Sequence, residues 1–225
     1  MEIKIISAKD FKKKPNQEEV WDSIAVPWKK YVVKTIPIVE EFLKGKKGKI
    51  VDLGCGSGRN IIPNPKVKYY AVDFSSKQLK HAKEYVKSKK IKAKIFKSSL
   101  DKLPSEFKDK MFDYGLFIAT LHCIDGSLER KNALKEFYRI LKPNAEGLIS
   151  VWNSEDKRFD CVGNHGEVYM SWKENGMDYM RYYYLYKKQE LLSLLKKTGF
   201  KILEVYKSRE KDRFSRKNWI IKIRK

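Results

Sequence analysis

A glycine-rich turn followed by a carboxylate contains the residues of this chain best suited to chemistry. Residues 50–60 read Ile-Val-Asp-Leu-Gly-Cys-Gly-Ser-Gly-Arg-Asn, and Asp73 ends the next apolar segment. Glycines let the backbone pass close to a ligand because no Cβ intervenes. Asp73 lies 19 residues beyond Gly54, a spacing at which an acid accepts hydrogen bonds from ribose hydroxyls. The pattern predicts a nucleoside site at the ends of two neighbouring strands.

The spacing of the glycines separates the kinds of nucleotide that such a turn could hold. Gly54, Gly56 and Gly58 alternate, whereas a dinucleotide site has its third glycine three residues after its second, and no phosphate-loop Lys-Ser or Lys-Thr pair follows. Asp52 would repel a pyrophosphate and suits a cationic or amino-bearing ligand. The turn resembles motif I of class I S-adenosylmethionine-dependent methyltransferases, and Asp73 matches their ribose-binding acid. A tight turn without a ligand is the structural alternative.

Composition bounds the class of protein. The chain has 225 residues, 42% of them hydrophobic, which is enough for one globular domain with a substantial core. No apolar run approaches the length of a membrane span, and the first residues lack the apolar core of a signal peptide. Cys55, Cys123 and Cys161 are scattered and odd in number, so we expect neither a disulfide framework nor a metal site, and a cytoplasmic location.

The chain is strongly basic. Fifty Lys and Arg against 28 Asp and Glu give a formal net charge of +22. Such a field concentrates polyanions at the surface and makes their binding sensitive to salt. A lysine-rich proteome is the alternative explanation, but it usually brings matching glutamate, which is lacking here. The charge therefore favours a nucleic acid as partner.

Apolar and amphipathic segments alternate through the middle of the chain. Strands are expected at residues 49–53, 69–72, 91–96, 112–119 and 147–152. Helices are expected at residues 75–87 and 128–141, the second followed by a turn at 142–144. This alternation predicts a doubly wound α/β fold with a mostly parallel, seven-stranded sheet that ends in an antiparallel pair at 200–206 and 219–223.

The remaining segments are expected to flank this core within a single domain, 1–225. Helices are expected at residues 18–30, with a break at Pro27, and at 36–43. Towards the C-terminus we expect irregular structure at 154–172, a strand at 177–185 and a helix at 188–198. The chain is accordingly divided into an N-terminal lid (1–45), a cofactor-binding core (46–152) and a substrate-side segment with the closing strands (153–225).

Several segments outside the glycine-rich turn are more specific. They lie at residues 20–25, 37–43, 119–122, 181–186 and 216–219, and read Val-Trp-Asp-Ser-Ile-Ala, Pro-Ile-Val-Glu-Glu-Phe-Leu, Ala-Thr-Leu-His, Arg-Tyr-Tyr-Tyr-Leu-Tyr and Arg-Lys-Asn-Trp. Together they resemble the tRNA wobble-uridine carboxymethyl methyltransferases, and the likeness runs from about residue 18 to 222. The resemblance implies methyl transfer from S-adenosylmethionine to the carboxylate of 5-carboxymethyluridine, an acceptor that is already ionised and needs no general base.

The resemblance also implies roles for individual residues. The catalytic candidates are His122 and Arg181. The cofactor-binding candidates are Asp52, Gly54, Gly56, Gly58, Asp73, Phe74, Ser98, Ser99 and Ile118. The substrate-binding candidates are Lys34, Tyr182, Arg216, Asn218 and Trp219. Each has a structural alternative: a core histidine, an arginine paired with a local acid, a tryptophan that closes the sheet, and tyrosines that belong in part to the core.

The chain departs from the family pattern at three places. Val32 aligns with an arginine of the family's lid, which leaves Lys29, Lys30 or Lys34 to supply a positive charge. Ser98-Ser99 replaces the acid that faces the adenine, and Asn144-Ala145 replaces two glycines. None of these changes abolishes the cofactor site, whereas the change at Val32 bears on the substrate assignment.

Two partners follow from this interpretation. The surplus of Lys and Arg is expected to hold the backbone of the tRNA anticodon stem-loop, for example through residues 87–94 and 207–217, while a flipped-out base enters the pocket. The resemblance implies a small zinc-binding activator subunit, which would pair with an exposed sheet edge at residues 91–96. The zinc would belong to that partner.

Two other functions remain open at this point. A class I methyltransferase for a small metabolite or a protein would keep every cofactor residue, but the net charge and residues 181–186 argue against it. A non-catalytic RNA-binding module is the other possibility, and the intact glycines and Asp73 argue against that.

Overall fold

The computed structural model describes residues 3–31, 34–208 and 218–225 of the chain. Its helices are α1 (Gln17–Ser23), α2 (Ala25–Tyr31), α3 (Pro37–Leu43), α4 (Ser76–Ser88), α5 (Ser127–Ile140) and α6 (Lys188–Thr198), with 3-10 turns η1 (Ala8–Asp10), η2 (Leu121–Cys123) and η3 (Lys157–Val162). Its strands are β1 (Ile5–Ser7), β2 (Gly48–Leu53), β3 (Val67–Asp73), β4 (Ala93–Lys97), β5 (Phe112–Ile118), β6 (Leu141–Trp152), β7 (Gly166–Glu174), β8 (Met177–Leu185), β9 (Lys201–Lys207) and β10 (Asn218–Arg224).

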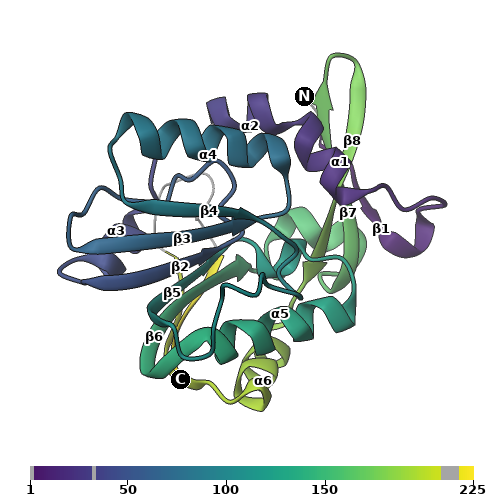
Figure 1. Ribbon diagram of the computed structural model, residues 1–225. Coiled ribbons are helices and arrows are strands. Elements are labelled where there is room, and N and C mark those ends of the chain that lie inside the picture. The colour runs from purple at the N-terminus through teal and green to yellow at the C-terminus, as the bar shows by residue number, and fades with distance from the viewer. Residues whose placement is uncertain (1–2, 32–33, 209–217) are drawn as a thin grey trace.

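A seven-stranded sheet forms the centre of the molecule, in the order β4-β3-β2-β5-β6-β10-β9 (Figure 1). Strands β2 to β6 run parallel, whereas β10 is antiparallel to both β6 and β9. The predicted doubly wound fold and its closing antiparallel pair are confirmed. Because parallel strands end at the same edge, the turns after β2, β3 and β5 lie together, where such sheets place their ligands.

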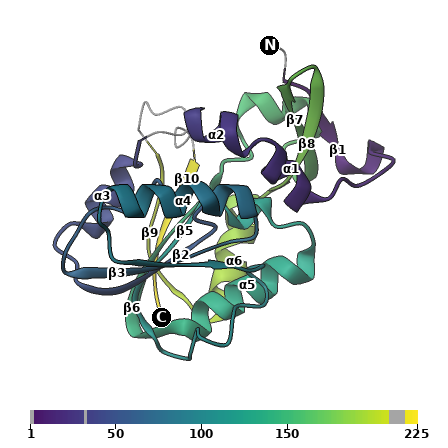
Figure 2. The ribbon, with the colours of Figure 1, turned by 45° about the horizontal axis from the view of Figure 1, so that its top comes forward.

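Helices cover both faces of this sheet (Figures 1 and 2). On one face, Phe42 of α3 and Leu79 of α4 pack with Ile50. On the other, Phe137 of α5 and Leu191 of α6 join a second core cluster. Burial on both faces explains why the parallel strands read as continuous apolar runs rather than as an alternating pattern.

A small second sheet, in the order β1-β7-β8, lies beside one end of the main sheet (Figure 2). The expectation of irregular structure over residues 154–172 was wrong, because η3 and β7 occupy most of this segment. Residues 168–171 are buried on both sides of β7, so no alternation marks the strand in the sequence. The strand forms because it pairs with β8, which follows it in the sequence, and with β1, which lies near the N-terminus.

Two element boundaries also differ from expectation. The N-terminal lid breaks at Ile24 rather than at Pro27, which lies in the first turn of α2, where a missing N–H is tolerated. Strand β6 begins at Leu141 instead of after a turn, since Leu141 pairs with Phe112. Val32 and Arg216 lie outside the described residues. Within the described ranges, no helix is long and apolar enough to cross a membrane.

Candidate active site

The glycine-rich turn runs from the end of β2 towards α4. Gly54 has a φ of +74°, and a Cβ there would lie 2.3 Å from the hydroxyl oxygen of Thr120. That hydroxyl donates to the Gly54 carbonyl over 3.2 Å and so ties the turn to the end of β5. Gly58, with a φ of +85°, comes close to the backbone of Ala82 in α4. The turn therefore needs glycine both for its conformation and for its packing.

Asp73 holds the turn from the end of β3. One of its carboxylate oxygens accepts from the Gly56 N–H over 2.8 Å, and the other accepts from the Ser75 N–H over 2.9 Å. Burial, with a smaller contribution from Asp22, raises the pKa of Asp73 to about 6, although these N–H bonds oppose the shift. A carboxylate oxygen can accept more than one hydrogen bond, so Asp73 keeps capacity for a ribose hydroxyl.

Asp52 is the second buried acid of the site. Only 1% of its surface is exposed, and neither carboxylate oxygen has a hydrogen-bond partner among the described residues. Burial raises its pKa to about 7, Asp73 adds to the rise, and Arg59 opposes it. An ionised carboxylate that is buried without partners destabilises the ligand-free protein. Binding of a positively charged ligand nearby would offset this destabilisation.

The cleft above the turn has walls from three parts of the chain. Gly54, Gly56, Asp73, Phe74 and Ile118 all line it, as the sequence predicts for cofactor-binding residues. The other side comes from the lid, where Trp21 and Trp28 face the turn, and from η2, where Cys123 lies at the wall. The cleft thus combines a glycine-rich floor, bordered by Asp73, with an aromatic wall.

Arg181 of β8 lies beside this aromatic wall and is 4% exposed. Its guanidinium donates to the Ser171 carbonyl over 3.3 Å, while its Nε has no hydrogen-bond partner among the described residues. It forms no ion pair with a described carboxylate, so the alternative of an arginine paired with a local acid is wrong. The rings of Trp172, Tyr183, Trp28 and Trp21 lie 5.3 to 6.0 Å from the guanidinium carbon.

His122 of η2 is enclosed by aromatic rings. Its ring centroid lies 5.0 Å from that of Trp152 and 5.7 Å from that of Tyr183, and neither ring nitrogen has a partner in the described part of the chain. Burial, with a smaller contribution from Arg158, lowers its pKa to about 3. The imidazole is therefore neutral near pH 7, and its side chain is almost fully buried. The neighbouring Cys123, rather than His122, is the residue that lines the cleft.

Comparison with known proteins identifies the family. A family model described as a methyltransferase domain matches residues 51–149. The tRNA (carboxymethyluridine(34)-5-O)-methyltransferase of Schizosaccharomyces pombe is 30% identical over 214 residues, which cover 83% of this chain and 89% of that protein. The chain belongs to this family of methyltransferases. The resemblance that the sequence segments carry is confirmed.

Solved structures support the same fold for this methyltransferase. An S-adenosylmethionine-dependent methyltransferase from Methanosarcina mazei matches with a TM-score of 0.68 at 20% identity, over 86% of this chain and 99% of that one. A Burkholderia thailandensis 1,6-didemethyltoxoflavin-N1-methyltransferase, solved with its substrate and S-adenosylhomocysteine, matches with a TM-score of 0.68 at 16% identity, over 95% and 92% of the two chains. At these identities the likeness concerns the fold.

The site of this methyltransferase fits S-adenosylmethionine. Asp73 lines the cleft and has acceptor capacity for a ribose hydroxyl. Asp52 is buried and not among the lining residues, but its partnerless carboxylate suits a nearby cationic group. Ser98 and Ser99 also do not line the cleft. The Ser98 hydroxyl donates instead to the Lys102 carbonyl over 2.9 Å, and Ser99 is exposed. Their contact with the adenine stays a prediction.

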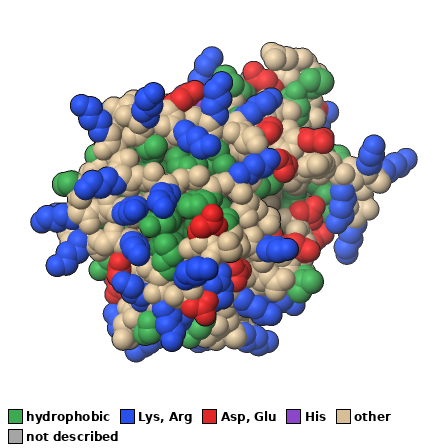
Figure 3. Space-filling model, in the orientation of Figure 1, with side chains coloured by type: hydrophobic (Ala, Val, Ile, Leu, Met, Phe, Trp, Pro, Cys, Tyr) green, Lys and Arg blue, Asp and Glu red, His purple; other side chains and the backbone are tan. Residues whose placement is uncertain are grey.

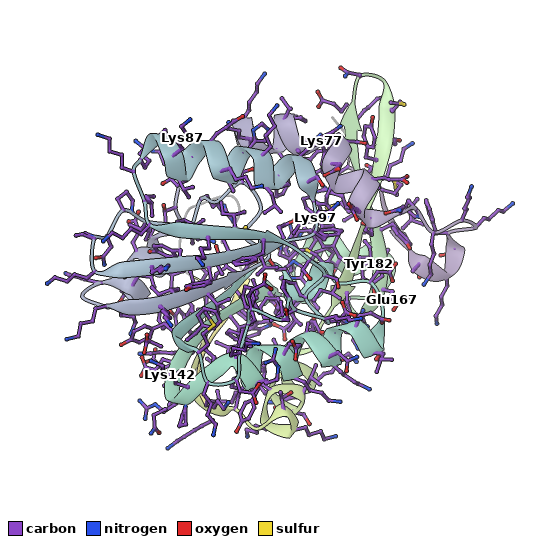
Figure 4. All side chains as sticks on the ribbon, viewed as in Figure 1. Lys77, Lys87, Lys97, Lys142, Glu167 and Tyr182 are labelled. Carbon is purple, nitrogen blue, oxygen red and sulfur yellow. The ribbon has the colours of Figure 1, made fainter. Side chains whose placement is uncertain are left out.

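The predicted substrate residues of the methyltransferase do not gather at the cleft. Tyr182 is fully buried, and its hydroxyl accepts from Arg130 and donates to Glu167, at the end of the molecule where Figure 4 labels Tyr182 and Glu167. Trp219 is 6% exposed and belongs to the core. For Tyr182 and Trp219 the structure therefore agrees with the core alternative and corrects the expectation of substrate contact.

The remaining substrate candidates are also separate from the cleft wall. Asn218 is buried in β10 opposite Trp152, while Lys34 is exposed in the segment before α3. Arg216 lies outside the described residues, so its predicted role has no structural counterpart here.

Some cleft residues have no counterpart in the sequence-based prediction. Trp21, Trp28, Gln78 and Thr120 line the cleft beside the predicted residues. The sequence offered a partial signal, since Trp21 falls at helical spacing in the amphipathic segment 18–30. The break at Ile24 places Trp21 in α1 and Trp28 in α2, and only the docking of both helices on α4 turns these rings towards the glycine-rich turn.

Proposed function

We propose that the chain transfers a methyl group from S-adenosylmethionine to the carboxylate of 5-carboxymethyluridine at the wobble position of a tRNA anticodon. The S. pombe relative, which carries this activity in its name, matches over most of both chains. The structural observation that carries the proposal is Arg181, a buried guanidinium beside the two tryptophans that line the cleft, which forms no ion pair with a described carboxylate. An arginine in this state is suited to a planar anion, and a carboxylate fits its fork of donors.

The chemistry asks little of the protein beyond alignment. The cofactor supplies a sulfonium methyl that is already activated for transfer. Asp73 would hold the ribose and Asp52 the positively charged part, which sets the direction of the methyl group. Arg181 would hold the acceptor carboxylate in line with it, so that most of the rate enhancement comes from proximity and orientation. No residue has to remove a proton, because the carboxylate is ionised near neutral pH.

The surface charge of the molecule supports tRNA as substrate. Lys and Arg side chains are spread over the face shown in Figure 3, and those of Lys77, Lys80, Lys83 and Lys87 are exposed along α4. Figure 4 marks Lys77 and Lys87 near the two ends of this helix. We expect the affinity for an anticodon stem-loop to fall steeply as the salt concentration rises, because lysines that bind phosphates release counterions from the RNA. Filter binding over a salt series measures this, and an affinity independent of salt would contradict it.

An activator subunit is the second proposed partner. Strand β4 lies at the edge of the main sheet, and Ile91, Ala93, Ile95 and Phe96 are only half-buried there. An apolar edge of this kind invites a further strand. A small zinc-binding activator would cover it and would bring its own metal, since the described residues hold no cluster of metal ligands. We expect co-expression with such a subunit to raise the yield and activity of the methyltransferase.

The cellular location proposed here is the cytoplasm, where tRNA substrates and a reducing environment occur together. The three cysteines are unpaired, which agrees with such an environment.

Mass spectrometry of nucleosides tests the proposed reaction most directly. Bulk tRNA that carries 5-carboxymethyluridine is incubated with S-adenosylmethionine and the protein, alone and with a candidate activator. The expected product is the methyl ester of that nucleoside, with no methylation of small carboxylic acids added in parallel. Methyl transfer to the small acids but not to tRNA would instead identify a metabolite methyltransferase. Binding of tRNA without cofactor binding by calorimetry would identify an RNA-binding module.

A further inference from the structure

Three tryptophans from distant parts of the chain meet around Arg181. Trp21 and Trp28 belong to the lid, and Trp172 belongs to β7. The ring centroids of Trp21 and Trp28 are 5.1 Å apart and those of Trp28 and Trp172 are 5.5 Å apart, both in edge-on arrangements. The guanidinium carbon of Arg181 lies 5.3 Å from the Trp172 ring and 5.6 Å from the Trp28 ring. We call these four residues the tryptophan enclosure.

The enclosure differs from an ordinary part of the core. Each of its three tryptophans is only half-buried, and Trp21 and Trp28 also line the cleft beside the glycine-rich turn. The indole N–H of Trp21 is buried without a partner among the described residues, and so is the Nε of Arg181. What sets the enclosure apart is that its half-buried rings supply an aromatic wall to the cleft, next to two donors without partners among the described residues.

The aromatic rings also keep the charge of Arg181 available. Ring faces stabilise a guanidinium through their quadrupoles when it is taken out of water. A carboxylate partner would do the same but would occupy the donors that a substrate needs. Because no described acid pairs with Arg181, its positive charge is partly supported by the rings and remains open to an anion.

We propose that the tryptophan enclosure is the subsite for the acceptor base: a flipped-out pyrimidine stacks on the cleft side of Trp21 or Trp28 while Arg181 binds its carboxylate. This inference rests on the proposed function and adds the specificity-determining residues to it. The ligand class is a planar base that carries an anionic group. A base without the anionic group keeps the stacking but loses the ion pair. The methyl ester product is neutral and loses the ion pair as well, which favours release of the product.

The position of the lid completes this subsite. The Asp22 carboxylate of α1 accepts from the Lys77 N–H over 3.0 Å and from the Ser75 hydroxyl, at the N-terminus of α4. Lys29 of α2 lies 3.3 Å from Glu84 of α4. The lid helices that carry Trp21 and Trp28 are thus docked on α4, the helix that follows Asp73. Helix α4 therefore positions the proposed base subsite relative to the proposed ribose-binding acid.

Tryptophan fluorescence measures nucleoside binding at the proposed subsite without any methyl transfer. The protein, saturated with S-adenosylhomocysteine, is titrated with 5-carboxymethyluridine, with uridine and with the methyl ester of 5-carboxymethyluridine. Quenching is expected with all three at high concentration, with an affinity for the carboxylate about tenfold or more above that of the other two, the range expected for a hydrogen-bonded charge pair. Equal affinities for the three nucleosides would overturn the role of Arg181.

Matched variants separate stacking from folding. Trp28→Ala is expected to raise the KM for tRNA about tenfold, as for loss of one base–aromatic stack. It should leave the Kd for S-adenosylhomocysteine within about twofold, by the same conversion of free energy, and Trp28→Phe should restore most of the loss. Arg181→Gln, which removes the charge, should abolish the preference for the carboxylate. Trp219→Phe, in the core outside the cleft, is the control and should leave the nucleoside affinities unchanged.

The outcomes distinguish this inference from the proposed function. If the wild-type protein forms the ester in tRNA but Trp28→Ala behaves like wild type, the subsite is wrong and the function stands. If no ester forms but 5-carboxymethyluridine still binds in preference to uridine, the proposed reaction is wrong and the subsite stands. If Trp28→Ala weakens the binding of S-adenosylhomocysteine as much as the binding of tRNA, the enclosure contributes to cofactor binding and the inference is overturned.

Discussion

Replacing Asp52 by asparagine is expected to make the ligand-free protein more stable at pH 8 and its binding of S-adenosylmethionine weaker. Asp52 is buried, neither of its oxygens has a described partner, and burial with nearby Asp73 raises its pKa from 3.8 to about 7. At pH 8 the folded protein therefore keeps a carboxylate ionised in a site that disfavours charge. Asparagine has nearly the same shape and removes that charge.

The sign of the effect follows from proton binding. The folded chain binds the proton of Asp52 more tightly than the unfolded chain does, so its contribution to the free energy of unfolding falls as pH rises from about 4 to about 7 and is fully lost above that. A difference of about three in pKa corresponds to roughly 4 kcal/mol. The buried amide of asparagine still lacks partners, which costs roughly 1–3 kcal/mol. The expected net gain at pH 8 is therefore about 1–3 kcal/mol.

Urea unfolding followed by circular dichroism, at pH 4.5 and pH 8 without cofactor, measures this gain. Asp113→Asn is the matched control: burial raises the pKa of Asp113, but Lys142 and the Lys49 N–H outweigh it, and the pKa is lowered overall. Its contribution is present above pH 4 and lost in acid, so the control should lose stability at pH 8. An Asp52→Asn protein no more stable than wild type at pH 8 would refute the reasoning.

Three further changes test the site. Asp73→Ala should remove measurable binding of S-adenosylmethionine in calorimetry while the chain stays folded, and heat of binding like that of wild type would contradict the ribose assignment. Gly54→Ala places a Cβ 2.1 Å from the Thr120 side chain at a φ of +74°, so it should lower the thermal midpoint and abolish cofactor binding; an unchanged midpoint would argue against the described turn. Asp22→Ala removes two of the bonds that dock the lid on α4, and hydrogen exchange over residues 17–31 should become faster, whereas unchanged protection would show that the other contacts, among them Lys29 with Glu84, hold the lid.

The parts of the fold that follow local rules could be predicted well. Ser75 caps α4, and α6 spans residues 188–198 as expected, because caps and helical periodicity depend on residues close in sequence. Strand β7 could not be found in this way. It is buried on both sides, its pairing partners include β1 about 160 residues away, and its composition shows no period.

The sequence by itself determined the cofactor side of the site. Asp52 and Asp73 lie on the adjacent parallel strands β2 and β3, and the alternating glycines from Gly54 to Gly58 form the turn after β2, so their spacing along the chain already implies that they meet at one edge of the sheet. The family segments likewise indicated the acceptor class, because the order of their residues is enough to carry the resemblance.

The residues proposed for the acceptor side come together only in the tertiary structure. Trp28 and Arg181 are more than 150 residues apart, and no periodic pattern relates two segments that meet through the docking of a lid on another helix. Burial also decided between roles that the sequence had left open, since it placed Tyr182 and Trp219 in the core and left Arg181 beside the cleft without an acid. Spacing encodes contacts within an element and between neighbouring parallel strands, whereas contacts between distant elements depend on how the whole chain packs.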